Sequence, residues 1–171
     1  MKKTSRGFWD KLAKPIMALA PMANVTDAAF RSIIAQYGKP DVIWTEFVSV
    51  DGLLSNGREK LLPDFWYAEA ERPIVAQIFG SKPEHFERVA GLLAELKFDG
   101  IDINMGCPVR KVINQQSCSA LLRTPQLAQE IIAATKQGAH GLPVSVKTRI
   151  GFSKVEIDSW IQIGRASCRE R

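Results

Sequence analysis

Cysteine and histidine are scarce in this chain of 171 residues, which has three cysteines and two histidines. Cys107, Cys118 and Cys168 form no CxxC pair and do not have the spacing of zinc ligands. We therefore expect no metal site. An odd number of cysteines without a secretion signal is typical of a protein in a reducing compartment, so we expect a cytoplasmic protein.

Long apolar runs are also lacking, because no stretch reaches the roughly 18 residues of a membrane-spanning helix. The first 20 residues imitate a secretion signal, but Asp10, Lys11 and Lys14 lie where its apolar core would be. We interpret residues 1–14 as a short leader and expect no membrane partner. The net charge of +5 and the pI of about 9.2 permit a nucleic-acid partner without requiring one.

Segments typical of strands alternate along the chain with segments typical of helices. The strands are expected at residues 16–20, 41–47, 74–80, 99–105 and 144–149. The helices are expected at residues 27–38, 83–97 and 124–137 and from about residue 153. No segment carries a hairpin signal, so the pattern predicts a parallel α/β sheet.

Two architectures fit such a pattern, an open doubly wound sheet and a (β/α)8 TIM barrel. In three of the expected strands polar residues share one face: Gln77 in the third, Asp102 and Asn104 in the fourth, and Ser145, Lys147 and Arg149 in the fifth. A polar interior face beside an apolar helix-facing one favours the barrel. No dinucleotide or P-loop fingerprint is present. We predict a partial TIM barrel that contains about the first five β/α units.

The fourth strand ends in a polar turn at residues 104–108, which presents Cys107 at the carboxyl end of the strand. Chemistry in α/β proteins gathers at the carboxyl ends of parallel strands. Cys107 is therefore a candidate acid or nucleophile. The alternative is a small buried cysteine in a tight turn, which is a common place for a free thiol.

Four segments, each at the end of an expected strand, resemble the tRNA-dihydrouridine synthase family. They are residues 20–27 with Phe30 and Arg31, residues 77–80, residues 102–108 with Lys111 and Val112, and residues 146–151. Each segment is weakly specific alone, whereas the four in this order are highly specific. The resemblance covers roughly residues 15–160.

The resemblance implies a flavin-bearing barrel, followed by a helical RNA-binding domain, that reduces the C5=C6 bond of uridines in tRNA. In this family NADPH reduces FMN, the flavin gives a hydride to C6, and a cysteine protonates C5. By this resemblance Cys107 is the catalytic proton donor. An ordinary thiol, with a pKa of about 8.5, is largely protonated at pH 7, which is the form that a proton donor needs.

The resemblance also assigns binding residues. Pro21, Met22 and Ala23 match a flavin-contacting turn, Gln77 matches a residue at the isoalloxazine edge, and Lys147 matches a lysine beside the flavin pyrimidine. Asn104 and Arg149 match residues near the substrate base, and Lys111 follows the catalytic turn, where it could meet RNA phosphate. A plain strand-ending turn, a lysine at the barrel rim and a solvated charged face are the structural alternatives.

The chain departs from the family pattern in its length and at its end. A barrel of this kind needs about 250 residues, so we interpret residues 1–162 as the N-terminal part of an FMN-binding barrel. The second half-barrel and the helical RNA-binding domain are then missing. Residues 163–171 resemble a translated sequencing adaptor, and we interpret them as a non-native tail.

A five-stranded piece of a barrel has two open edges, so we expect this fragment to be inactive alone and prone to aggregation. The full-length enzyme is expected to be a monomer. Two other functions stay open at this point. One is a flavin barrel that acts on a free pyrimidine, and the other is a non-catalytic half-barrel that binds RNA or a partner chain.

Overall fold

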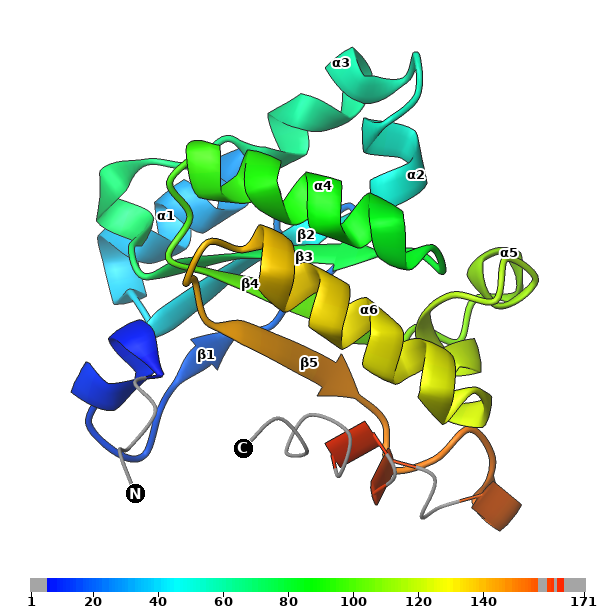
Figure 1. The fold of residues 1–171 in the computed structure, drawn as a ribbon. Coiled ribbons are helices and arrows are strands. Elements are labelled where there is room, and N and C mark those ends of the chain that lie inside the picture. Colours follow the sequence, from blue (N-terminus) through cyan, green and yellow to red (C-terminus); the bar gives the residue numbers. More distant parts are fainter. Residues whose placement is uncertain (1–5, 157–159, 162, 165–171) are drawn as a thin grey trace.

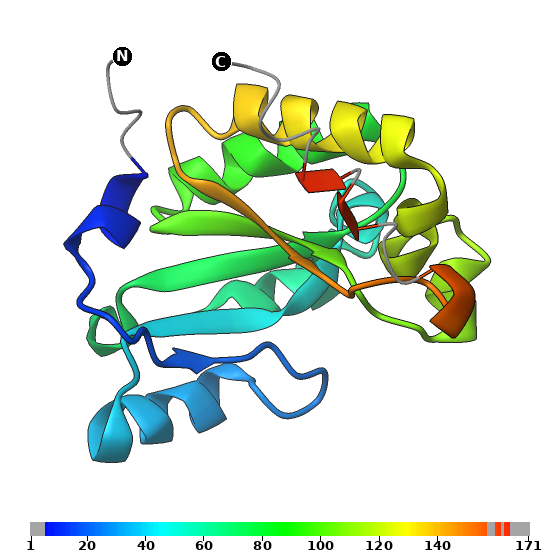
Figure 2. The same ribbon diagram turned by 90° about the horizontal axis from the view of Figure 1, so that it is seen from below.

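The computed structural model describes residues 6–156, 160–161 and 163–164. Five strands form one parallel sheet in the order of the sequence (Figure 1). They are β1 (Ala18–Leu19), β2 (Val42–Ser49), β3 (Ile74–Phe79), β4 (Gly100–Met105) and β5 (Val144–Thr148). A doubly wound sheet would reverse its strand order part-way, and this one does not. The sheet curls instead into part of a TIM barrel, which confirms the predicted architecture (Figure 2).

Three longer helices connect the strands. They are α1 (Ala28–Gly38), α4 (Pro83–Glu95) and α6 (Pro125–Gly138). Shorter helices follow β2 and β4, namely α2 (Val50–Leu53), α3 (Arg58–Leu61) and α5 (Arg110–Ile113). The 3-10 segments are η1 (Gly7–Lys11), η2 (Leu62–Phe65), η3 (Glu69–Glu71), η4 (Cys118–Arg123) and η5 (Lys154–Glu156). Figure 1 shows α4 and α6 side by side over one face of the sheet.

The hydrophobic core lies between that outer face and the helices. Ile101, Ile103 and Met105 of β4 are fully buried there. The helix after β3 also faces this core, through Phe86, Val89, Ala90 and Leu93. Leu96 is different, because α4 ends at Glu95 and the Leu96 side chain is 37% exposed.

The helix α1 is anchored at its amino end. Asp27 is its N-cap, and the carboxylate accepts a hydrogen bond from the Phe30 backbone N–H at 2.8 Å. Arg31 of α1 is fully buried, and its Nε lies 2.7 Å from a Glu71 carboxylate oxygen in η3. The Arg31 guanidinium also donates to the Thr26 carbonyl at 2.7 Å. These bonds fix the chain that leads out of β1.

The predicted first strand and last helix differ from the structure in their bounds. The first strand is only Ala18–Leu19, although the apolar run at residues 16–20 predicted five residues. The helix expected from about residue 153 begins as η5, and residues 157–159 and 162 lie outside the described residues. Most of the expected tail at residues 163–171 is likewise outside them. Within the described part of the chain, no helix has the length and apolar character needed to cross a bilayer.

Candidate active site

The inner face of the sheet is polar where the outer face is apolar. The parallel register pairs Gln77 of β3 with Asp102 of β4, and Asp102 with Ser145 of β5. Two residues further along, Asn104 pairs with Lys147. Because side chains alternate across a strand, these five lie together on the inner face toward the carboxyl ends of the strands.

Four of these side chains, all but that of Lys147, form one hydrogen-bonded chain. The Ser145 hydroxyl donates to Asp102 Oδ1 at 2.6 Å, and Gln77 Nε2 donates to Asp102 Oδ2 at 2.6 Å. Asn104 Nδ2 in turn donates to Gln77 Oε1 at 3.0 Å. The Gln77 side chain is fully buried, and both of its amide atoms are used within the sheet.

Asn104 connects these hydrogen-bonded side chains to the turn that follows β4. Its Oδ1 accepts hydrogen bonds from the backbone N–H groups of Gly106 and Cys107, each at 3.0 Å. The Cys107 carbonyl accepts from the Ser119 N–H at 3.3 Å, which ties the turn to η4. Cys107 is thus a half-buried thiol on a turn held from both sides, at the carboxyl end of β4 as predicted.

Asp102 is the titratable group at the centre of the inner face, with a side chain 2% exposed. Burial raises the pKa of its carboxyl from 3.8 to about 6. The hydrogen bonds from Ser145 and Gln77 and the positive charge of Lys147 oppose this rise. The carboxylate therefore remains charged at neutral pH through its hydrogen-bond donors and one nearby cation.

Cys118 is the second free cysteine of the described chain, and it is completely buried beside Cys107. Burial, reinforced by Cys107, raises the pKa of the Cys118 thiol to about 12. The Cys118 backbone has φ = +55°, a left-handed conformation that favours glycine. This geometry gives Cys118 a packing position behind the turn of Cys107.

A pocket of about 290 Å³ opens on the inner face beside β5. The pocket is lined by residues of the first strand and turn, by two tryptophans, and by residues of β4 and β5: Ala18, Ala20, Pro21, Trp9, Trp44, Asp102, Ser145, Val146 and Lys147. The Trp44 indole N–H is buried and has no hydrogen-bond partner among the described residues. The pocket thus combines a small-residue wall, an aromatic ring with an unused donor and a cation. This combination suits a flat aromatic ring with an anionic edge.

The turn after β1 contains the predicted residues Pro21, Met22 and Ala23. The Met22 backbone N–H donates to the Thr26 hydroxyl at 3.0 Å, and the Met22 carbonyl accepts from the Thr26 N–H at 3.0 Å. The Asn24 N–H donates to a carboxylate oxygen of Glu46. Of the three predicted residues, Pro21 lines the inner pocket, and Met22 is 40% exposed.

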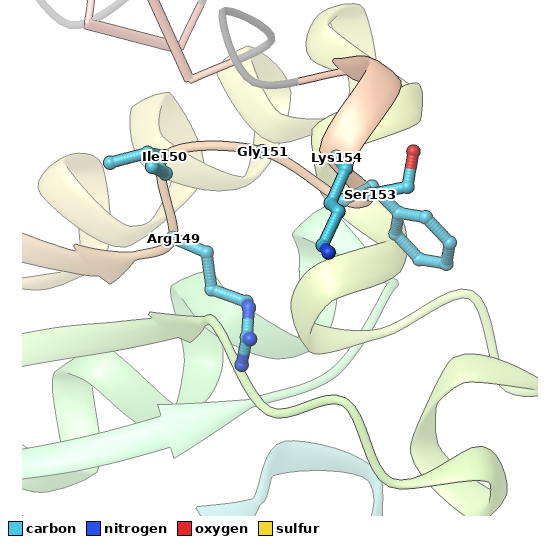
Figure 3. A pocket seen from close by; sticks show the side chains of 6 residues that line it. Arg149, Ile150, Gly151, Ser153 and Lys154 are labelled. Carbon is cyan, nitrogen blue, oxygen red and sulfur yellow. The ribbon is translucent and has the colours of Figure 1, made fainter.

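Arg149 and Lys111 lie outside the buried network. Arg149 follows β5, and its Nη1 is 3.4 Å from the Gly106 carbonyl, so its side chain reaches the turn of Cys107. Figure 3 shows Arg149 beside a pocket of about 510 Å³ that residues 149–154 line. Lys111 is an exposed residue of α5, beyond the carboxyl end of β4. The structure therefore gathers the predicted residues at one end of the barrel, with Lys111 on its periphery.

Sequence reasoning missed several residues that build this site. Asp102 and Ser145 were placed on the polar face but were not singled out, and Thr45 and Glu46 were not considered. The Thr45 hydroxyl accepts from the Gln77 backbone N–H at 3.1 Å, where β2 has a register shift. The polar alternation in β4 and β5 was the available signal for Asp102 and Ser145. Among the described residues, no cluster of three His, Cys, Asp or Glu side chains could hold a metal ion.

Comparison with known families decides the relationship. A model of the family described as dihydrouridine synthase (Dus) matches residues 18–170. The chain belongs to the dihydrouridine synthase family. This membership confirms the resemblance that the four strand-end segments indicated.

Curated members of the dihydrouridine synthase family align with nearly the whole chain. "Probable tRNA-dihydrouridine synthase 2" of Bacillus subtilis (strain 168) is 43% identical over 157 residues, which are 91% of this chain and 47% of that protein. "Probable tRNA-dihydrouridine synthase" of Staphylococcus aureus (strain COL) is 45% identical over 154 residues, 90% of this chain and 46% of that protein. The chain thus spans about half the length of the curated relatives it matches.

Proposed function

We propose that the full-length protein reduces uridine in tRNA to 5,6-dihydrouridine, with FMN as its bound cofactor and NADPH as the source of electrons. The observation that carries this proposal is the Cys107 turn, which Asn104 holds at the carboxyl end of β4 through two backbone N–H groups. Family membership supports the same reaction. Both relatives described above are named as acting on tRNA.

In this proposal Cys107 is the catalytic acid. Its S–H bond breaks as a new C–H bond forms at C5 of the uracil ring, and solvent later returns a proton to the sulfur. FMN, when bound, would supply the hydride that reaches C6. One hydride and one proton together saturate the C5=C6 bond, so the two-electron reduction balances.

The residues around the inner pocket fit a flavin. Lys147 would place a positive charge at the pyrimidine end of the flavin ring, where the reduced form is anionic. Pro21, Met22 and Ala23 would form the turn along one edge of the ring, with Pro21 in the pocket wall. Gln77 would lie behind the ring edge and hold Asp102 and Asn104 in place.

The substrate would approach from the carboxyl end of the barrel. Arg149 would meet the flipped uridine there, since its side chain already extends to the catalytic turn. Asn104, 8% exposed, would shape the site of the base through the turn that it holds. Lys111 is exposed on α5 and would contact an RNA phosphate.

We further propose that residues 1–162 are the N-terminal part of the barrel of a monomeric cytoplasmic enzyme. The remaining strands and a helical RNA-binding domain would complete the active site, and the fragment alone would be inactive and prone to aggregation. Resequencing the native gene past residue 162 tests the interpretation of residues 163–171 as a non-native tail. A reading frame that keeps these nine residues would contradict it.

The proposed activity is tested with the full-length protein and an unmodified tRNA transcript. We expect the purified protein to show a flavin absorbance spectrum and, with NADPH, to add two hydrogen atoms to particular uridines of the tRNA. Nuclease digestion and mass spectrometry measure this change. The same assay with free uracil and uridine is the control for an enzyme of free pyrimidines. Reduction of the free pyrimidine without reduction of tRNA would contradict the proposal, and so would a protein that binds tRNA but reduces nothing.

A further inference from the structure

Asp102 is a buried carboxylate of the inner face, and the proposed chemistry gives it no role. Its direct hydrogen-bond partners are neutral groups, the Ser145 hydroxyl and the Gln77 amide. Burying a carboxylate among neutral partners costs stability, so an apolar residue would be cheaper at this position. The contacts around Asp102 indicate what the carboxylate does there.

An ionised carboxylate only accepts hydrogen bonds, and a backbone N–H only donates them. The chain of side chains has the Asp102 carboxylate at one end and the Gly106 and Cys107 N–H groups at the other. Two amides, Gln77 and Asn104, lie between these ends. Each amide has one donating and one accepting side, so the two ends together fix the direction of both.

The direction that results is the one observed. With Gln77 Nε2 turned to Asp102, its Oε1 faces Asn104 and receives Asn104 Nδ2. Asn104 then has only Oδ1 left for the turn, which is the atom that the Gly106 and Cys107 N–H groups require. Reversing either amide would oppose two donors or two acceptors within the buried chain.

We propose that Asp102 is a positioning residue that fixes the donor–acceptor direction of Gln77 and Asn104 and thereby holds the turn of Cys107. The importance of Asp102 for catalysis rests on the proposed function, whereas the donor–acceptor direction of the hydrogen-bonded side chains does not. The carboxylate touches neither the Cys107 thiol nor the substrate in this account. It acts through two intervening amides, so its removal loosens the turn rather than removing a reacting group.

The donor–acceptor direction is tested by exchanging the acid at position 102 and the amide at position 104 in the full-length protein. In Asn104→Asp two acceptor-only groups face Gln77, so one contact must be repulsive whichever way the amide turns. In the double variant Asp102→Asn/Asn104→Asp the chain runs in the opposite direction, and the amide introduced at position 102 donates to Gln77 while accepting from Ser145. We expect the melting temperature of the double variant to exceed that of Asn104→Asp by roughly 3 °C or more. A double variant that melts no higher than Asn104→Asp would overturn the proposal.

The effect on the turn is tested with Asp102→Leu, which offers no acceptor to Gln77. We expect amide hydrogen exchange at Gly106 and Cys107 to become about tenfold faster, as measured by fragment-resolved mass spectrometry. We also expect kcat to fall about tenfold while KM for tRNA is unchanged. Ser145→Ala is the matched control, because it removes the other bond to Asp102 without touching the path to the turn, and exchange should stay within about twofold of wild type.

Equal exchange rates in Asp102→Leu and Ser145→Ala would overturn the positioning role. If Asp102→Leu does not fold, the melting temperatures of Asn104→Asp and of the double variant decide the test alone. The exchange and melting measurements need neither tRNA nor turnover. A wild-type protein that makes no dihydrouridine would therefore refute the proposed function and leave the test of Asp102 intact.

Discussion

The two faces of β4 show how one strand serves two purposes. Its outer residues, Ile101, Ile103 and Met105, are fully buried against the helices in a dry core. Its inner residues, Asp102 and Asn104, are nearly as buried but are held by directional hydrogen bonds. The side chains on both faces are buried, yet only the inner ones can fix the orientation of a neighbouring group.

This difference indicates where stability and activity come from. Apolar packing is non-directional, so substitutions on the outer face should lower stability without redirecting the turn of Cys107. Hydrogen bonds on the inner face contribute less net free energy, but they set which atoms point at the turn of Cys107. Substitutions there should affect activity more than stability.

The largest expected effect on stability is on the outer face. Ile103→Ala removes a fully buried side chain, and we expect it to lower the free energy of unfolding of the full-length protein by about 3 to 4 kcal/mol. Asn104→Ala, its neighbour on the inner face, should cost about 1 to 2 kcal/mol and abolish most of the activity. Denaturant unfolding and the tRNA reduction assay measure the two effects. A larger stability loss in Asn104→Ala than in Ile103→Ala would break the contrast between the faces.

The outer layer also depends on a close contact between its two long helices. A Cβ atom at Gly138 of α6 would lie 2.0 Å from the Glu87 carbonyl oxygen of α4. Because that neighbour is backbone, we expect Gly138→Ala to lower the free energy of unfolding by about 2 to 3 kcal/mol. Gly38→Ala in α1 is the control, since no atom lies within 4 Å of its Cβ position, and it should be nearly neutral. Equal melting temperatures for the two variants would contradict the close packing of α4 on α6.

The buried carboxylate of Asp102 on the inner face should make the stability of the protein depend on pH. The folded-state pKa of Asp102, about 6, lies above its unfolded value of 3.8, so the folded state binds the extra proton. The stability gained in this way is fully present below pH 3.8 and is lost as the pH rises through about 6. Between pH 7.5 and pH 5 we expect wild type to gain about 1.4 kcal/mol relative to Asp102→Asn in denaturant unfolding. A difference between the two proteins that is the same at both pH values would contradict the raised pKa.

The smallest expected effect concerns Cys118, where substitutions can distinguish loss of packing from backbone strain. Cys118 is fully buried but has a positive φ. Glycine adopts this conformation without strain, whereas alanine does not. We expect Cys118→Gly to be about 0.5 to 1 kcal/mol more stable than Cys118→Ala, although glycine is the smaller residue. Thermal unfolding of the two variants measures this, and a more stable alanine variant would be the contrary result.

The sequence predicted the fold more completely than it predicted the site. Apolar and polar alternation in β3, β4 and β5 indicated a barrel because that alternation follows directly from strand geometry. Helix α1 was correctly bounded by Asp27 and Gly38, since caps act locally. The first strand was predicted too long, because an apolar run does not show where the ladder of hydrogen bonds ends.

The site could be predicted only as far as local motifs extend. The turn of Cys107 was visible as a strand end followed by glycine and proline. The bond from Ser145 to Asp102, in contrast, joins residues 43 positions apart and depends on the register of β4 and β5. The Thr45 contact with Gln77 depends on a register shift in β2 that no sequence pattern marks. The catalytic role of Cys107 stays a prediction that experiment must decide.

The most direct measurement compares the two neighbouring thiols in the full-length enzyme. Cys107→Ala and Cys118→Ala each remove the sulfur atom of one free cysteine, the first half-buried and the second buried. Dihydrouridine formed per minute in unmodified tRNA is measured by mass spectrometry, with flavin content and tRNA binding checked in both variants. We expect the rate to fall by about a hundredfold or more in Cys107→Ala and to be mostly retained in Cys118→Ala. A Cys107→Ala enzyme that forms dihydrouridine at the wild-type rate would contradict it.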